Sequence, residues 1–339
     1  MVPDGVYDRF QELLGQRWRS ARDAWMAKFA EYGKQFPELA SHLDKIQKRE
    51  MPEGWDADLP AFPADPMGLA GRDASGKVEN AIAKRLPWLF GGATDLAPSI
   101  KTRLTFEGAG DLEANNYGGC NLHFGIREHA MGSIVNGLSL SKLRPFGSGF
   151  LIFSDYRCAP IRLSALMEIP VIFIFTHDSI GVGEDGPTHQ PVEQLISLRA
   201  IPGLIVMRPG EANEVVCLIL SRQNMPTLDR TKYASASGVA RGAYILADAI
   251  GGRPDVILIG TGSDVSLCVD AYEKLTQEGI KARVSVEQAS VFSWDRYARL
   301  RIGLHTFGAS APLKELQNKF GFTPDAVAAA AREELAKAQ

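Results

Sequence analysis

Two patterns of hydrophobic and polar positions divide the chain into an N-terminal helical part and a larger mixed part. From Tyr7 to Tyr32, apolar residues recur in steps of three and four, which predicts one helix with a largely aromatic stripe. The stripe consists of Tyr7, Phe10, Leu14, Trp18, Ala21, Trp25, Phe29 and Tyr32. A shorter helix is expected from Pro37 to near Glu50, followed by an extended linker to Met67. Aromatic residues at helical spacing are typical of packing surfaces, so we assign this stripe no chemistry.

From Gly68 onward the pattern alternates between helices and strands. In the first stretch we expect helices at 75–84 and 128–141 and strands at 88–91, 149–153, 171–176 and 204–208. A second unit begins near Ala243, with strands at 255–260 and 282–286, a helix at 265–277 and a closing helix from Pro324. Strands separated by helices predict an α/β fold with parallel sheets and right-handed crossovers.

Two stretches are shorter than a parallel α/β fold requires. Only eight residues separate Arg208 from the apolar run 217–220, whereas a crossover with its helix needs at least ~10 residues. After Val286 few strands remain for a second full sheet, which predicts a shortened last domain. The turn from Gly260 to Ser263 could hold an anion at a helix N-terminus, although such turns are commonly only turns.

Composition narrows the class of partners. The 339 residues, of which 45% are apolar, are enough for two compact domains. The net charge is −3, and no basic cluster is interleaved with aromatic residues as in nucleic-acid surfaces. Widely spaced cysteines without a CxxC pair argue against disulfides or a zinc site; they are Cys120, Cys158, Cys217 and Cys268. Neither a signal peptide nor a membrane-spanning stretch is visible. We expect a cytoplasmic protein that acts on small molecules, with no nucleic-acid or membrane partner.

The candidate chemistry gathers after the strand at 171–175. The loop from His177 to Gln190 holds two histidines, three carboxylates, two hydroxyls and three glycines, and ligands of parallel sheets bind beyond the carboxyl ends of strands. An ordinary solvated loop is the alternative. A second polar cluster, from Gly125 to Gly132, opens a helix with Glu128 in its first turn, where the helix dipole favours negative charge. Taken alone, this cluster is equally consistent with a surface ion pair of Arg127 and Glu128.

The two motifs together resemble transketolase, a thiamine-diphosphate enzyme. The resemblance rests on Gly-Ile-Arg-Glu-His-Ala-Met at 125–131 and on the loop at 177–191, and it continues through 71–76, 91–99, 150–156, 220–224 and 308–312. It covers essentially the whole chain but only part of the family's architecture. It implies a helical linker segment at 1–67, a pyrimidine-binding domain of the thiamine-diphosphate-enzyme type at 68–235, and a shortened transketolase C-terminal domain at 236–339.

The resemblance also assigns roles to individual residues. Glu128 matches the catalytic glutamate that contacts N1′ of the cofactor's aminopyrimidine, and His189 matches a second catalytic position. The matched cofactor residues are Asp95, Glu128, Phe150, Phe153 and Tyr156, whose three aromatic rings form a wall for pyrimidine stacking. The matched substrate residues are Arg72, Ser99, His177, Asp185, His189 and Arg222, which suit a sugar phosphate. The role of Glu128 requires a carboxylic acid that an apolar pocket keeps near neutrality.

The family's diphosphate-binding domain, with its Gly-Asp-Gly…Asn motif, has no counterpart in this sequence. The resemblance therefore implies thiamine diphosphate held here only through its pyrimidine half, Mg²⁺ expected only with the missing domain, and no metal ligands in this chain. A family insert between Val216 and Cys217 and a segment near Arg283 to Ser285 look deleted. Cys120 stands at a usually basic position, and the run 157–160 replaces a small-residue turn beside the aromatic wall.

Two functions from different classes follow. The first is transfer of a two-carbon ketol unit between phosphosugars, in partnership with a separate diphosphate-binding transketolase subunit, as a homodimer, or both; the isolated chain is expected not to turn over. The alternative is a catalytically silent transketolase remnant or regulatory dimerisation module. Among enzymes, the alternative to transketolase is a deoxyxylulose-phosphate synthase or a pyruvate-dehydrogenase-type beta subunit. Transketolase ranks first because the loop start His177-Asp178-Ser179 resembles it more than it resembles those two families.

Overall fold

The computed structural model describes residues 2–214, 219–249, 253–280, 282–292 and 294–338, in two units that span 1–53 and 54–339. The first unit is helical. Helix α1 (Val6–Phe10) continues through a π-helical turn (Gln11–Gly15) into α2 (Gln16–Gln35), and α3 (Pro37–Lys48) follows directly. No residue of these helices is buried. The two helices that the sequence predicts are confirmed, and Pro37 separates them because it starts a helix but cannot continue one.

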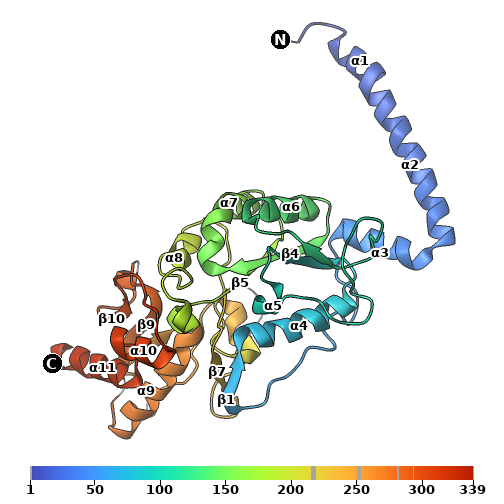
Figure 1. Cartoon of the computed structure of the whole chain (residues 1–339). Helices are drawn as coiled ribbons and strands as arrows, with labels where there is room; N and C mark the ends of the chain where they lie inside the picture. Colours follow the sequence, from blue (N-terminus) through green and yellow to red (C-terminus); the bar gives the residue numbers. More distant parts are fainter. Residues whose placement is uncertain (1, 215–218, 250–252, 281, 293, 339) are drawn as a thin grey trace. The chain divides into compact units, whose positions relative to one another are not determined.

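The second unit contains a five-stranded, all-parallel sheet in the order β3-β2-β4-β5-β6. Its strands are β2 (Leu89–Ala93), β3 (Asn121–His123), β4 (Arg144–Phe150), β5 (Ile172–Thr176) and β6 (Ile219–Leu220). Helices α6 (Glu128–Leu140) and α7 (Cys158–Leu166) lie on one face, and α4 (Gly71–Arg85) and α5 (Ala97–Ile100) lie on the other (Figure 1). The predicted parallel α/β fold is confirmed.

Two further strands bring the beginning and the end of this sheet region together. β1 (Asp65–Ala70) pairs antiparallel with β7 (Asn224–Thr227), with Leu69 opposite Met225. Gly68, at φ 63°, lies so close to this partner that a Cβ would fall 1.7 Å from the Met225 carbonyl oxygen. The pairing therefore depends on a glycine at this position.

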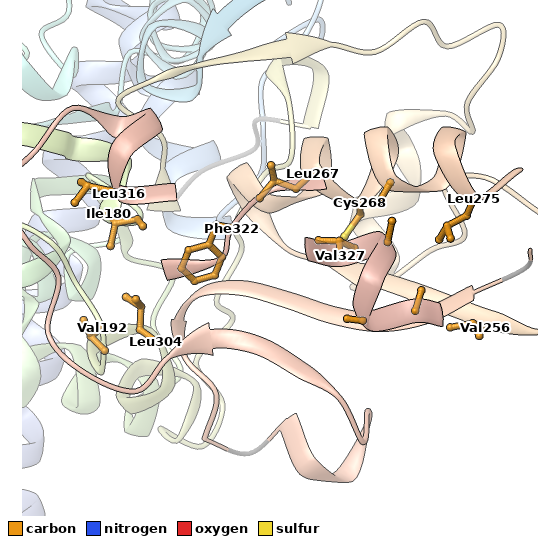
Figure 2. Packing of buried hydrophobic residues seen from close by; sticks show 14 residues of the cluster. Ile180, Val192, Val256, Leu267, Cys268, Leu275, Leu304, Leu316, Phe322 and Val327 are labelled. Atoms are coloured by element: carbon orange, nitrogen blue, oxygen red, sulfur yellow. The ribbon is translucent and has the colours of Figure 1, made fainter. Parts of the chain in front are cut away.

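The C-terminal part forms a second parallel sheet in the order β10-β9-β8. Its elements are β8 (Val256–Gly260), α9 (Val265–Gln277), β9 (Ala282–Ser290), β10 (Arg301–Leu304), α10 (Leu313–Phe320) and α11 (Pro324–Ala338). Figure 2 shows that its core includes Ile180 and Val192, which come from the loop after β5 and pack beside Leu304, Leu316 and Phe322. One hydrophobic core thus spans the strand-end loop and the C-terminal sheet.

Two predicted strands differ from the structure. No strand forms at 204–208; Leu204 and Val206 pack against the core as partly buried side chains, and the ladder position beside β5 belongs to Ile219 and Leu220. The sequence pattern was therefore wrong here because burial alone, without pairing, accounts for the apolar run. The strand predicted at 149–153 ends at Phe150, where a 3-10 helix (Leu151–Arg157) begins.

The structure describes residues 209–214 of the predicted short crossover, where a 3-10 turn (Ala212–Glu214) forms. The last two residues of the stretch belong to 215–218, which lie outside the described residues together with Cys217. Lys281, which precedes the second suspected deletion at Arg283 to Ser285, also lies outside. Among the residues that the structure describes, no helix combines the length and the apolar character needed to cross a membrane.

Candidate functional site

The loop from His177 to Gln190 is folded rather than solvated. His177, Asp178, Ser179 and Gln190 are buried, and Ile180–Asp185 forms a 3-10 turn. The Gln190 side-chain amide donates to the carbonyls of Gly183 (2.9 Å) and Ala309 (2.8 Å), which ties the loop to the C-terminal segment. The polar loop at the end of β5 is therefore held by contacts within itself and with the segment after β10.

Five predicted site residues form one aromatic–imidazole cluster, which consists of Phe150, Phe153, Tyr156, His177 and His189. The ring centroid of Phe150 lies 4.4 Å from that of His177 and 6.0 Å from that of Phe153. The His189 ring meets both phenyl rings edge-on, at 5.5 and 5.7 Å, and Tyr156 extends the row at 6.1 Å from Phe153. The structure thus brings the predicted aromatic wall and both loop histidines together.

Arg72 and Arg222 line a neighbouring cavity of about 360 Å³, which we call the two-arginine cavity. The Arg72 guanidinium donates to the Ser99 carbonyl at 2.8 Å, and Arg222 donates to the Val182 carbonyl at 2.5 Å. Each guanidinium retains further donors for a ligand. Arg72, from the first turn of α4, and Arg222, from the segment after β6, meet only through the fold.

The pKa of His177 follows from its position in the aromatic–imidazole cluster, next to the two-arginine cavity. Burial, together with the positive charges of Arg72 and Arg222, lowers the pKa of His177 to about 3. The imidazole is therefore neutral at neutral pH, and its buried Nδ1 has no hydrogen-bond partner. A neutral ring beside two cations can donate to or accept from a ligand without adding charge.

Three predicted site residues stand apart from the cluster. Glu128 is half-buried at the start of α6, and Asp95 and Asp185 are exposed. Within the described part of the chain, no hydrogen bond, ion pair or ring contact joins these carboxylates to the aromatic–imidazole cluster. The Ser99 carbonyl binds Arg72, and no contact is seen for the Ser99 hydroxyl among the described residues.

Arg157 is a functional candidate that the sequence reasoning noted only as a departure from the family. Its side chain is fully buried, and none of its three guanidinium nitrogens has a hydrogen-bond partner. The guanidinium carbon lies 4.9 Å from the Phe175 ring centroid, and a Cβ on Gly149 would come within 2.0 Å of a guanidinium nitrogen. Burial lowers the pKa of Arg157 to about 10, and the charge of Glu128 opposes that shift. A buried cation therefore lies within electrostatic reach of Glu128.

Sequence reasoning also missed a buried network around Arg208. Its guanidinium donates to Asp178 (2.9 Å) and Asp264 (2.9 Å), and Glu287 lies 3.8 Å away. Burial lowers the pKa of Arg208, but the charges of these three carboxylates outweigh it and raise the pKa above its ordinary range. Asp178 follows His177 in the chain, so the network anchors the site. An arginine at the end of an apolar run was the only available signal.

The same network explains the turn from Gly260 to Ser263. The Thr261 carbonyl and hydroxyl accept from Arg208 at 2.9 Å, and the Ser263 hydroxyl donates to Asp178 at 2.9 Å. The turn therefore serves an internal contact between the two sheets and offers no open anion site.

Metal-ligating groups are sparse. Among the described residues, no three histidine, cysteine or acidic side chains gather in a way that could hold a metal ion. Cys120, Cys158 and Cys268 are free thiols, and Cys217 lies outside the described residues. The described side chains thus offer cationic and aromatic contacts for a ligand.

These features define a parallel α/β protein whose strand-end loop places two arginines and two histidines beside an aromatic wall. Sequence comparison agrees with that class. Residues 67–228 match the model of the transketolase pyrimidine-binding domain, and 242–285 and 280–323 match that of the transketolase-like C-terminal domain.

Individual relatives extend the match to nearly the whole chain. The Bacillus subtilis transketolase is 40% identical over 369 residues, covering 95% of this chain and 55% of that protein. A chloroplastic transketolase of Craterostigma plantagineum is 40% identical over 381 residues, covering 98% of this chain and 72% of that protein. The chain belongs to the transketolase family. It spans about half the length of most curated relatives it matches, and the aligned lengths exceed its own 339 residues, so these relatives carry segments without a counterpart here.

Solved structures of transketolases also match most of this chain. Transketolase of Pichia stipitis in complex with sedoheptulose-7-phosphate has a TM-score of 0.91 at 34% identity, with 99% of this chain and 56% of that chain covered. A split-gene transketolase, described as an inactive β4 tetramer, matches at a TM-score of 0.60 and 21% identity, with 79% of this chain and 99% of that chain covered. The latter likeness concerns the fold alone.

Proposed function

We propose that this chain is one half of a thiamine-diphosphate-dependent transketolase, the half that binds the sugar substrate and contacts the pyrimidine ring of the cofactor. Such an enzyme transfers a two-carbon ketol unit between phosphosugars. The observation that carries the proposal is the aromatic–imidazole cluster beside the two-arginine cavity. A phosphate needs fixed cationic donors, and a flat heterocycle needs aromatic faces. Both lie at the carboxyl end of one parallel sheet.

The residues present suit the pyrimidine half of thiamine diphosphate. Phe150, Phe153 and Tyr156 offer ring faces, of which Tyr156 is 67% exposed, and Glu128 is half-buried at the head of α6. When bound, thiamine diphosphate supplies a carbon nucleophile that takes up and releases the two-carbon unit. Glu128 would hold a proton at N1′, and Asp95 would contact the cofactor. We assign the diphosphate and Mg²⁺ to a partner domain.

Substrate roles follow from the same geometry. Arg72 and Arg222 would bind the phosphate of the sugar, with neutral His177 and Ser99 as hydrogen-bonding partners. His189, whose ring rests edge-on against Phe150 and Phe153, would act on the sugar near the reacting carbon. Asp185 would hydrogen-bond the sugar hydroxyl next to the reacting carbon. This role requires its exposed side chain to turn from solvent toward the two-arginine cavity.

The chain spans about half the length of the relatives it matches, and the proposal includes a partner that would supply the diphosphate-binding function. We propose a separate diphosphate-binding transketolase subunit, with homodimers of the resulting assembly. A split-gene transketolase offers a precedent for separate chains. We retain 1–67, 68–235 and 236–339 as linker, pyrimidine-binding and C-terminal domains, and free thiols at Cys120 and Cys158 fit the cytoplasm.

A complementation assay tests the function. The chain is mixed with a diphosphate-binding transketolase half, thiamine diphosphate and Mg²⁺, and ketol transfer from a ketose phosphate to an aldose phosphate is measured. We expect activity only in the mixture, and loss of at least about 100-fold in Glu128→Gln. The matched control is Glu315→Gln, which changes an exposed glutamate in the first turn of α10. Equal activity in Glu128→Gln would remove the assigned role of this glutamate.

One observation favours the alternative of a catalytically silent remnant. The buried Arg157 guanidinium has no hydrogen-bond partner among the described residues, and it belongs to the run 157–160 that departs from the family beside the aromatic wall. A mixture that binds thiamine diphosphate and sugar phosphate without ketol transfer would support this alternative.

A further inference from the structure

The segment 308–313 follows β10 and contacts the strand-end loop at 177–190. The Gln190 side-chain amide donates one hydrogen bond to the Gly183 carbonyl in its own loop (2.9 Å) and one to the Ala309 carbonyl (2.8 Å). The Ser310 hydroxyl donates to the Glu184 carbonyl. Residues 308–312 belong to the motifs that resemble transketolase, and the proposed function gives them no role.

Gly308 leaves space for the Gln190 side chain. A Cβ at position 308 would lie 1.7 Å from Oε1 of Gln190, and the next nearest atoms belong to the same side chain. Gln190 is buried, and its amide uses both N–H donors, one toward the loop and one toward the segment. We call this arrangement of Gln190 between Gly183 and Ala309 the amide clamp.

The amide clamp joins two parts of the wall of the two-arginine cavity. Residues 181–184 of the loop line this cavity, and so do Pro312 and Leu313 at the end of the segment. Arg72 and Arg222 line it from α4 and from the stretch after β6. The wall of this cavity is therefore built in part by a segment that lies after β10, outside the five-stranded sheet and its helices.

Apolar packing holds the loop and the C-terminal part together behind the clamp. Figure 2 shows Leu316 of α10 beside Ile180, which starts the 3-10 turn of the loop. Both side chains are fully buried. Hydrophobic contact is not directional, whereas hydrogen bonds require defined distances and angles. The packing therefore keeps the two parts close, and the amide clamp fixes their relative position.

A sugar phosphate would meet groups from separate parts of the chain. Its phosphate would bind Arg72 and Arg222, and its sugar would meet Asp185 and His189 of the loop, of which His189 directly precedes Gln190. When one ligand binds at two points, the second contact raises the affinity only if the geometry allows both at once. The distance between the loop and the arginines therefore decides the affinity for the whole sugar phosphate.

We propose that Gln190 is a positioning residue for the sugar phosphate and that the 308–313 segment is part of its binding site. The amide clamp holds the strand-end loop at the distance from Arg72 and Arg222 that the ligand spans. The inference rests on the proposed function for the identity of the ligand. Inorganic phosphate meets only the arginine end, so its affinity depends little on the clamp, whereas fructose 6-phosphate requires both ends.

The test measures dissociation constants of the full chain for inorganic phosphate and for fructose 6-phosphate by isothermal titration calorimetry. Gln190→Ala removes the amide clamp, and Gly308→Ala forces the Gln190 amide out of place. We expect each variant to weaken fructose 6-phosphate binding at least about 10-fold and inorganic phosphate binding less than about threefold. Far-UV circular dichroism and urea unfolding verify that each variant is folded during the titration.

Ser310→Ala removes only the contact with the Glu184 carbonyl, at an exposed position, and carries the same test if a clamp variant fails to fold. It should weaken fructose 6-phosphate binding about fivefold. Gly308→Ala should be harmful only while Gln190 is present. The double variant Gln190→Ala/Gly308→Ala should therefore bind no more weakly than Gln190→Ala alone.

Two matched controls change the same residue types elsewhere. Gln277→Ala alters an exposed glutamine at the end of α9, and Gly137→Ala alters an exposed glycine of α6 at which a Cβ would meet no described atom within 4 Å. Both should leave the two dissociation constants within about twofold.

Clamp variants that bind fructose 6-phosphate as tightly as the unmodified chain would overturn the inference, even if the mixture with a diphosphate-binding half is active. Equal weakening of both ligands would also overturn it, because the clamp would then support the cavity as a whole. Absence of fructose 6-phosphate binding by the unmodified chain has the same consequence. Clamp-dependent binding without ketol transfer in the mixture supports the inference and counts against the proposed function.

Discussion

Replacing Arg157 by methionine should stabilise the protein. The side chain is fully buried, and its guanidinium nitrogens have no hydrogen-bond partners. Burial lowers the pKa of Arg157 from its ordinary value to about 10, which corresponds to about 3 kcal/mol of unfavourable free energy for the charged form in the folded state. Below pH 10 both folded and unfolded chains keep this proton, so the cost is present in full at pH 7 and is relieved only as pH rises through about 10.

Methionine is unbranched and flexible like arginine but two atoms shorter, and its sulfur and methyl group can pack toward the Phe175 ring that the guanidinium contacts. Loss of the cation–π contact offsets about 1 kcal/mol, so we expect a net gain of about 2 kcal/mol in the free energy of unfolding. Urea unfolding at pH 7 measures this gain. The control is Arg162→Met, the same change at an exposed position of α7, with an expected effect within about 0.5 kcal/mol. A loss of more than about 1 kcal/mol in Arg157→Met would refute the reasoning, because it would mean that the guanidinium is well paired.

Further predictions concern the buried network and the loop histidine. Arg208→Met leaves Asp178 and Asp264 buried without their cation and should cost about 3–5 kcal/mol of stability; Arg332→Met, which removes an exposed ion pair, should cost less than about 1 kcal/mol by the same urea assay. Comparable losses in the two variants would contradict this account. The pKa of His177 is about 3 in the folded state against about 6.5 unfolded, so the unfolded chain takes up the proton first as pH falls, and stability should drop by about 2 kcal/mol between pH 7 and 5. His177→Asn should lack that component, and identical pH profiles would show that the imidazole is not held neutral.

Local sequence signals predicted those elements for which the hydrophobic period and the residues at the ends indicate the same helix or strand. The helix at 265–277 was placed with its observed bounds, because its apolar residues recur at helical spacing directly after a glycine-bearing turn. β5 was recognised from its run of β-branched and aromatic residues. The stretch 204–208 has similar composition but forms no ladder, because Ile219 and Leu220 take the place beside β5. Pairing depends on residues distant in sequence, which a local pattern does not contain.

In the candidate site, too, some residues were indicated by the sequence and others became apparent only in the fold. Motif resemblance identified Arg72, Arg222 and both loop histidines, and the fold brings Arg72 and Arg222 to one cavity and both histidines to one aromatic row. Resemblance did not predict the Arg208 network, whose partners come from three segments far apart along the chain.

The sequence by itself determined the helical periods, the parallel α/β class and the residue types available at the end of β5, because these depend on neighbours along the chain. Only the tertiary structure decided which charges are buried. It neutralises His177, leaves the Arg157 guanidinium without hydrogen-bond partners among the described residues and surrounds Arg208 with carboxylates. The physical reason is that the energy of a charge depends on desolvation and on groups that folding brings within a few ångströms, and neither is local in sequence.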